Sequence, residues 1–138
     1  PEKHEEAPNI DLDLSMLKRK VDAGADYIVT QMFFDNKKYF EFVERCKAFD
    51  INVPIIPAIK PIVNRNQLTI LPKIFHVDLP SELAIALSEC KDDLAAKQVG
   101  VEWCTQQAKE LVASGVPSIH FYSHNATESV KQVASQIY

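Results

Sequence analysis

Apolar and polar residues alternate along the chain in blocks that predict helices separated by short strands. An amphipathic helix is expected over residues 14–23, with Asp11 or Asp13 as its N-terminal cap. Gly24 is the expected helix stop. A short strand rich in apolar and β-branched residues follows over residues 27–31.

The same patterns predict the rest of the chain. Two more strands are expected, over residues 53–59 and 118–122, and the prolines Pro54 and Pro57 confine ladder pairing in the first of these to a few residues. Further helices are expected over residues 36–49, 93–114 and 127–137. Two more are expected between these: one is capped by Asn64 and ends near Phe75, and a short one starts at Ser81.

This order of elements predicts an α/β fold in which parallel strands are joined by helical crossovers. Three strands form a small sheet with two open edges, and open edges favour association with another chain. The chain also begins at Pro1 without an initiator methionine. We therefore expect a fragment, or one piece of a larger barrel whose earlier strands are missing.

Composition places the chain among ordinary globular domains. Its 138 residues suffice for one domain with a core, and 46% are hydrophobic while 25% are charged. A net charge of −4 disfavours a nucleic-acid-binding surface. No apolar run approaches the length of a membrane span, and the N-terminus is too charged for a signal peptide.

Cysteine and glycine positions disfavour two classes of site. Three cysteines, Cys46, Cys90 and Cys104, lack metal-type spacing, are expected within helices, and are typical of reduced thiols in a cytosolic protein. The three glycines form neither a dinucleotide fingerprint nor a P-loop, which counts against a doubly wound nucleotide-binding domain.

The most informative stretch is Thr30-Gln31-Met32-Phe33-Phe34-Asp35, at the end of the first strand. Parallel α/β proteins place their chemistry at the carboxyl edge of the sheet. The amide of Gln31 both donates and accepts hydrogen bonds, although it can equally bond a neighbouring backbone group. Phe33 and Phe34 either stack on a planar ring or belong to the core, and Asp35 can cap the next helix.

Four stretches of the chain together resemble the methylenetetrahydrofolate reductase family. They are residues 30–35, the run Leu17-Lys18-Arg19-Lys20-Val21-Asp22-Ala23-Gly24-Ala25-Asp26, residues 55–62 and residues 120–122. Residues 1–4 resemble the end of that family's fifth barrel strand. The resemblance implies a (β/α)8 TIM barrel, of which residues 1–138 are the C-terminal portion, with about three parallel strands and flanking helices.

The resemblance also implies an activity. Family members use NAD(P)H to reduce FAD, and the flavin reduces 5,10-methylenetetrahydrofolate to 5-methyltetrahydrofolate in one-carbon metabolism. The family's general-acid glutamate and flavin-tuning aspartate lie on earlier strands, so the isolated chain is expected to be inactive.

Five positions match FAD-contacting residues of the family: His4, Ala7, Asp13, Arg19 and Lys20. Arginine and lysine suit the flavin diphosphate, and a carboxylate accepts hydrogen bonds from ribityl hydroxyls. Each has a plainer alternative: a solvated N-terminal histidine, a helix cap, or a solvated cationic helix face.

Gln31 and Gln67 match the family's folate-contacting glutamines. For Gln67 the alternative is an exposed helical residue. Tyr122, at the end of the last strand, either borders the flavin or packs within the barrel.

The chain departs from the family pattern at three positions. Met16 stands in place of an asparagine, Ala58 in place of a glycine, and Ala126 in place of an arginine that pairs with the folate tail. The Cβ of Ala58 would crowd its strand end, or force a backbone change if the glycine uses positive φ. His124 is a partial substitute for the missing arginine.

Two other classes of protein remain open from the sequence. One is a different barrel flavoenzyme, such as a proline dehydrogenase-like protein, which the Thr-Gln-aromatic-aromatic-Asp strand fits less well. The other is a non-catalytic fragment that folds only with a partner or by self-association through its open edges.

Overall fold

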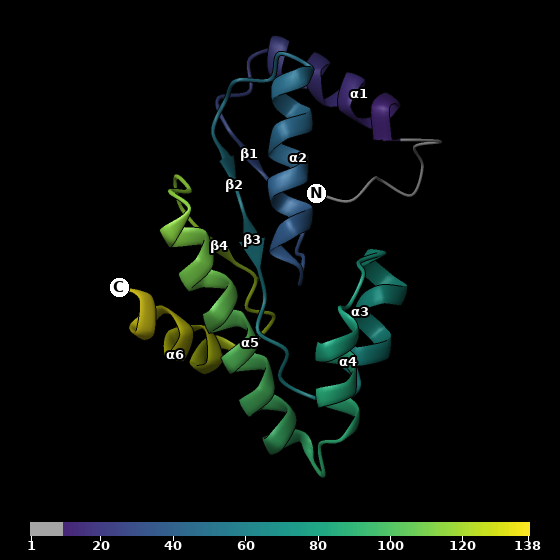
Figure 1. Ribbon diagram of the computed structural model, residues 1–138, viewed down its shortest axis with the longest axis vertical. Coiled ribbons are helices and arrows are strands. Elements are labelled where there is room, and N and C mark those ends of the chain that lie inside the picture. Colours follow the sequence, from purple (N-terminus) through teal and green to yellow (C-terminus); the bar gives the residue numbers. More distant parts are fainter. Residues whose placement is uncertain (1–9) are drawn as a thin grey trace.

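The computed structural model describes residues 10–138, and helices dominate it (Figure 1). His4, Ala7 and the resemblance of residues 1–4 to a barrel strand lie outside these residues. The helices are α1 (Ile10–Asp22), α2 (Asn36–Ala48), α3 (Gln67–Phe75), α4 (Ser81–Ser88), α5 (Asp93–Ala113) and α6 (Thr127–Ile137). The strands are β1 (Ile28–Val29), β2 (Ile55–Ile56), β3 (Ala58–Ile59) and β4 (His120–Phe121).

All strand pairing in the described part of the chain is parallel, as predicted. Strand β1 pairs with β2 in the register Ile28 to Ile55, and β3 pairs with β4 in the register Ala58 to His120. Pro57 separates β2 from β3 and has no N–H to donate, but its carbonyl accepts from His120 N at 2.9 Å. The prediction that prolines confine the pairing to a few residues is confirmed.

The strands are shorter than expected: those expected over residues 27–31 and 118–122 are Ile28–Val29 and His120–Phe121, and the one expected over residues 53–59 is divided into β2 and β3. Two expected details of the helices are also wrong. Helix α1 begins at Ile10, so Asp11 and Asp13 lie in its first turn, where their charges favour the helix dipole, and neither is the cap. Cys90 lies just beyond α4 and not within a helix. Apolar periodicity cannot place a helix end to better than a turn, which accounts for both differences.

Gly24 ends α1 as predicted. It adopts φ of +122°, a conformation that residues with a Cβ rarely adopt. Its N–H donates to Val21 O, and Ala25 N–H donates to Lys20 O, so the last carbonyls of α1 are satisfied before the chain turns into β1.

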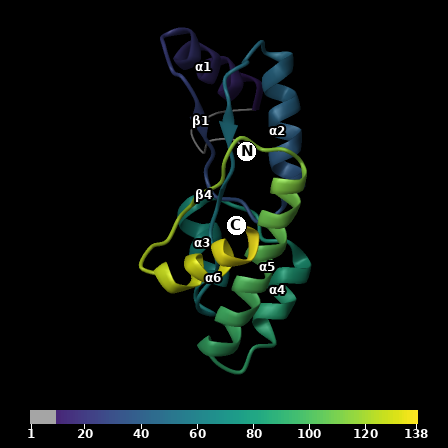
Figure 2. The ribbon, with the colours of Figure 1, turned by 90° about the vertical axis from the view of Figure 1, so that its left-hand side faces the viewer.

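The buried apolar side chains form two clusters. The first, here called the sheet core, lies between the strands and helices α1, α2, α5 and α6; its members include Leu14, Phe33, Ile59, Cys104 and Val133. The second, here called the α3–α4 core, includes Met32, Phe34, Ile62, Leu71 and Leu87. Figure 2 shows α2 and α5 on one side of the strands, where they cover the sheet core.

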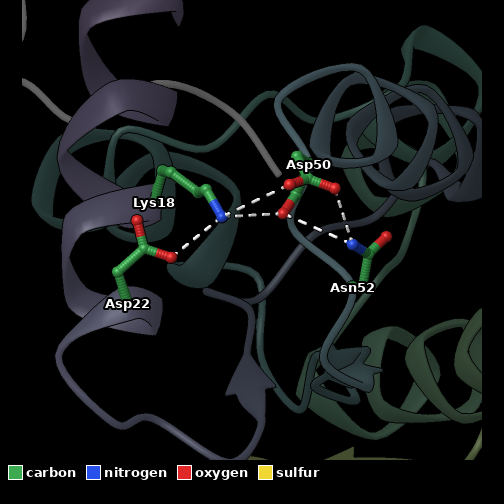
Figure 3. A network of polar contacts seen from close by, with 4 residues as sticks. All are labelled: Lys18, Asp22, Asp50 and Asn52. Carbon is green, nitrogen blue, oxygen red and sulfur yellow. Dashed lines mark hydrogen bonds and ion pairs between the residues drawn. The ribbon is translucent and has the colours of Figure 1, made fainter.

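A polar network fixes α1 to the turn that precedes β2 (Figure 3). Lys18 Nζ lies 2.8 Å from Asp22 Oδ1 and donates to Asp50 O at 2.9 Å. Asp50 has φ of +58°, and Asn52 Nδ2 donates to its Oδ1 at 2.9 Å. The hydrogen bond to Asp22, together with the charges of Asp22 and Asp50, raises the pKa of Lys18 above its ordinary value.

Helix α5 lies unusually close to the segment that follows β3. A Cβ on Gly100 would overlap the carbonyl of Ile62, so only glycine allows this approach. Ala96, one turn earlier, belongs to the α3–α4 core, and Val101 and Cys104 belong to the sheet core. Helix α5, which is held at Gly100, therefore contributes residues to both cores.

We predict that Gly100→Ala destabilises the protein by about 3 kcal/mol, because the added Cβ must push apart two backbones. The gain in helix propensity, about 1 kcal/mol, does not offset this. Urea denaturation measures the difference. Gln106→Ala, an exposed substitution on the same helix, is the control and should change stability by less than about 0.5 kcal/mol. A Gly100→Ala protein as stable as the parent would contradict the close approach.

Candidate functional site

The carboxyl ends of the strands meet around Thr30. Its Oγ1 accepts from Ala58 N at 3.0 Å, and Tyr122 Oη lies 3.5 Å from its carbonyl oxygen. Thr30 N donates to Ile56 O at 3.1 Å. Residues from all three strand segments therefore fix the backbone position from which Gln31 extends.

Gln31 is exposed, although its neighbours Thr30 and Met32 are buried. Its Oε1 accepts from Met32 N at 2.9 Å, which is the backbone-bonded geometry considered above as the alternative to a substrate contact. The Nε2 donors of Gln31 bond no group in residues 10–138, so they remain available to a ligand.

Gln67 is the first residue of α3 and is half-buried. Its Oε1 accepts from Val63 N at 2.8 Å, and its own N–H donates to Asn64 Oδ1 at 3.1 Å, so the side chain closes the loop after β3. The following residue, Leu68, packs on the same α3–α4 core as Met32. Gln31 and Gln67 thus adjoin the same apolar cluster.

The aromatic pair after β1 belongs to the core and does not form an open stacking platform. Phe33 is fully buried and stacks on Tyr39 with ring centroids 5.7 Å apart, and Phe34 is buried in the α3–α4 core. Asp35 caps α2 as predicted, since its Oδ1 accepts from Lys37 N at 3.0 Å. Within residues 30–35, Gln31 is the residue whose side chain is exposed.

The predicted flavin-binding residues of α1 lie along one helix. Asp13 is half-buried in the first turn, and Arg19 and Lys20 are exposed in the last turn. Asp13 and Arg19 are six positions apart, which corresponds to about 9 Å of helix axis. Helix α1 ends beside the amino end of β1, so the structure does not group Arg19 and Lys20 with Gln31 (Figure 1).

The departures from the family pattern have simple local settings. Ala58 is buried in β3 and does not use positive φ, so the substitution for glycine requires no change in the backbone. Ala126 is buried at the start of α6, and Met16 is exposed. His124 is exposed and has φ of +40°; its ring stacks on Phe75 at a centroid distance of 5.9 Å.

The sequence reasoning missed Lys60, which directly follows β3. It is 1% exposed, and its Nζ makes one hydrogen bond in the described part of the chain, to Pro61 O at 3.4 Å. Burial lowers the pKa of Lys60 below the usual lysine value, and burial raises the pKa of the neighbouring Cys104 thiol to about 12. A single charge within the run Ile-Pro-Ala-Ile-Lys-Pro-Ile was the available signal.

An open cavity of about 640 Å³ lies at the opposite edge, between α2 and the turns before β2 and β4. None of the predicted site residues lines it.

Residues 10–138 contain no cluster of three or more histidine, cysteine or acidic side chains that could hold a metal ion. Among the helices of the described range, none combines the length and apolarity needed to cross a bilayer.

Comparison with known proteins assigns this arrangement to a family. The family model described as methylenetetrahydrofolate reductase matches residues 1–138, the whole chain. The chain belongs to the methylenetetrahydrofolate reductase family. It is 42% identical to methylenetetrahydrofolate reductase (NADH) 1 of Arabidopsis thaliana over 85% of the chain and 20% of the relative. It is 39% identical to 5,10-methylenetetrahydrofolate reductase of Escherichia coli over 93% of the chain and 44% of the relative.

Relatives are named for both nicotinamide cofactors. The probable methylenetetrahydrofolate reductase (NADPH) of Caenorhabditis elegans is 34% identical over 97% of the chain and 20% of the relative. The chain thus spans less than half the length of the curated reductases it matches.

A solved structure shares the fold. It is an uncharacterized protein from Clostridium thermocellum that binds two copies of 5-methyl-5,6,7,8-tetrahydrofolic acid. The TM-score is 0.58 at 18% identity, over 93% of this chain and 48% of that one. At this identity the likeness concerns the fold.

We predict that Lys60→Met raises the free energy of unfolding of this reductase-family chain by about 1 kcal/mol or more at pH 7, because it removes a buried ammonium that has no counter-ion in the described part of the chain. The folded protein releases the Lys60 proton at a lower pH than the unfolded chain, whose lysine pKa is 10.5. Parental stability therefore rises as the pH approaches that value, and the advantage of the variant shrinks.

Urea denaturation between pH 7 and pH 10 measures both effects. The exposed Lys109→Met on α5 is the matched control and should change stability by less than about 0.5 kcal/mol. A loss of several kcal/mol in Lys60→Met would show that Lys60 is a satisfied structural cation.

Proposed function

We propose that the protein carrying this chain reduces 5,10-methylenetetrahydrofolate to 5-methyltetrahydrofolate with NADH or NADPH through FAD. The chain then forms the C-terminal portion of a (β/α)8 barrel, and its parallel strands and helical crossovers support that assignment. The observation that carries the proposal is the exposed amide of Gln31 at a rigid strand end, in a chain that matches the reductase family along its whole length.

In this proposal Gln31 binds the folate. Its free Nε2 donors suit the acceptor atoms of a pterin ring, and rotation of the amide away from Met32 N frees Oε1 as an acceptor. Gln67 holds the loop after β3 with its Oε1, and in this proposal its Nε2 donors are the groups that bind the same ligand. The name of the solved neighbour, which binds 5-methyltetrahydrofolic acid, supports a folate ligand.

The residues of α1 fit an FAD diphosphate. The side chains of Arg19 and Lys20 are exposed and bond no group in residues 10–138, whereas the side chain of the adjacent Lys18 is committed to Asp22 and Asp50. Bound FAD would supply the hydride relay between the nicotinamide and the folate. His4, Ala7 and Asp13 complete the proposed FAD contacts, and Arg19 and Lys20 neutralise phosphate charge.

We also infer a cytoplasmic setting and a part in the synthesis of the methyl group of methionine. Cys46, Cys90 and Cys104 are free thiols, which supports a reducing compartment. Both outer edges of the strand layer lack a partner in the described chain, and they are where self-association would occur.

We predict that Gln31→Ala weakens binding of 5-methyltetrahydrofolate about tenfold, because two or more hydrogen bonds to the ligand are lost. Gln31→Glu retains the acceptors and loses the donors, so it separates the two roles. Isothermal titration calorimetry of the protein that carries the chain measures the Kd. Gln106→Ala, an exposed glutamine on α5, is the control. Unchanged affinity in Gln31→Ala would remove Gln31 from the site.

We predict that the double substitution Arg19→Ala and Lys20→Ala weakens FAD binding about tenfold or more and reduces its dependence on salt, because two charge-assisted phosphate contacts are lost. Riboflavin lacks the diphosphate, so its affinity should not change. Retention of the flavin absorption band through gel filtration and fluorescence titration report the binding.

The charge-matched control replaces two exposed lysines elsewhere, Lys109→Ala and Lys131→Ala. Equal losses of FAD affinity in both double variants would mean that net charge alone attracts the cofactor. Equal losses of FAD and riboflavin affinity would place Arg19 and Lys20 away from the diphosphate.

A further inference from the structure

Two adjacent carbonyls of the β1–α2 loop, residues 30–36, are held by side chains of α5. Phe33 O accepts from Gln107 Nε2 at 3.2 Å, and Phe34 O accepts from Trp103 Nε1 at 2.9 Å. The two donors are four residues apart on α5, so they face the loop from successive turns of one helix. This loop connects the strand end at Thr30 to α2 and carries Gln31.

A reciprocal pair of amides fixes the far end of the loop. Asn36 Oδ1 accepts from Gln107 Nε2 at 3.1 Å, and Asn36 Nδ2 donates to Gln107 O at 3.1 Å. The second Nδ2 hydrogen goes to Glu110 Oε2 at 2.8 Å. Both amides are buried, so the two bonds between them do not compete with water and hold the loop in one position.

The arrangement is not explained by stability alone. Gln107 Oε1 is buried and accepts no hydrogen bond in the part of the chain that the structure describes. An orphaned buried acceptor costs about as much as two neutral hydrogen bonds contribute. Gln107 therefore keeps one polar atom buried and unsatisfied while its Nε2 bonds two acceptors of the loop, which indicates a role in the geometry of the loop.

The hydrogen bonds to the loop surround one exposed side chain, that of Gln31. Within residues 30–36, Gln31 alone is exposed, and Thr30, Met32, Phe33, Phe34 and Asn36 are buried. Thr30 is bonded to β3 on one side of Gln31, and α5 holds the carbonyls on the other side. The position of the Gln31 amide is thus defined from both sides.

We propose that Trp103, Gln107 and Asn36 are positioning residues that hold the β1–α2 loop so that Gln31 meets the folate substrate. This inference rests on the proposed function, because it assigns these residues a part in the same folate site. None of the three touches the substrate, and each acts through the loop backbone.

Gln107→Leu is the central test, because leucine has a similar volume and removes both donated bonds together with the orphaned oxygen. We expect lower thermal stability, because Phe33 O and Asn36 Oδ1 lose their donor, together with faster hydrogen exchange of the loop amides and an affinity for 5-methyltetrahydrofolate about threefold to tenfold weaker. Trp103→Phe, which removes the bond to Phe34 O, should act in the same direction. FAD affinity should not change in either variant.

Val133→Ala is the matched control for a merely structural effect. Val133 is fully buried in the sheet core on α6 and its side chain has no polar atom that could bond the loop, so its truncation lowers stability by cavity formation without removing a hydrogen bond. It should leave the folate affinity unchanged although it, too, is less stable than the parent. A folate affinity that follows melting temperature across Val133→Ala, Gln107→Leu and Trp103→Phe would overturn the proposal.

A double-mutant cycle separates this inference from the proposed function. If Gln107 acts through Gln31, Gln107→Leu should cost no further affinity in the Gln31→Ala background. Full additivity of the two losses would show that Gln107 does not act through Gln31. Weaker binding in Gln31→Ala with parental binding in Gln107→Leu would overturn the positioning role alone. Parental folate affinity in Gln31→Ala would instead remove the folate role on which the inference depends.

Discussion

The close approach of α5 to the chain after β3 is the contact on which the rest of the structure depends. Gly100 permits it, since any Cβ would overlap the Ile62 carbonyl. From that point the 21-residue helix packs on the α3–α4 core with one end and on the sheet core with the other. The strand segments have only two residues each, so the helix packing holds the parts of the chain together more than the strand ladders do.

The β1–α2 loop gains its rigidity from this helix. Phe33 enters one core, Met32 and Phe34 enter the other, and the intervening carbonyls bond to α5. A loop with buried residues on both cores cannot move without opening both. Gln31 therefore lies on a rigid support, which is the arrangement that a hydrogen-bonding group needs if it is to select a ligand by geometry.

Three consecutive cations on α1 illustrate how position decides role. Lys18 bonds to Asp22 and Asp50 and ties α1 to the turn before β2 (Figure 3). Arg19 and Lys20 point elsewhere because each successive helical residue rotates by about 100°, and they remain exposed. The buried Lys60 is the opposite case, because its ammonium bonds only the carbonyl of Pro61 and has no counter-ion within residues 10–138.

The sequence by itself determined the order of elements, the parallel pairing expected from their alternation, and the family. Periodicity, prolines and caps such as Asp35 are local signals, so they could be interpreted without a structure. The family motifs likewise named Gln31 and Gln67, because those motifs are contiguous in the chain. The boundary of α1 and the place of Cys90 were missed, because helix ends depend on tertiary packing as well as on sequence.

Only the tertiary structure decided which side chains surround Gln31. The bonds from Trp103 and Gln107 to the loop join residues 69 to 74 positions apart, and no local pattern encodes such a pairing. The burial of Lys60 and the choice of Phe33 and Phe34 as core residues also depend on elements far away in the chain. Sequence periodicity reports which face of an element is apolar; the partner that covers that face is set by how the elements pack in three dimensions.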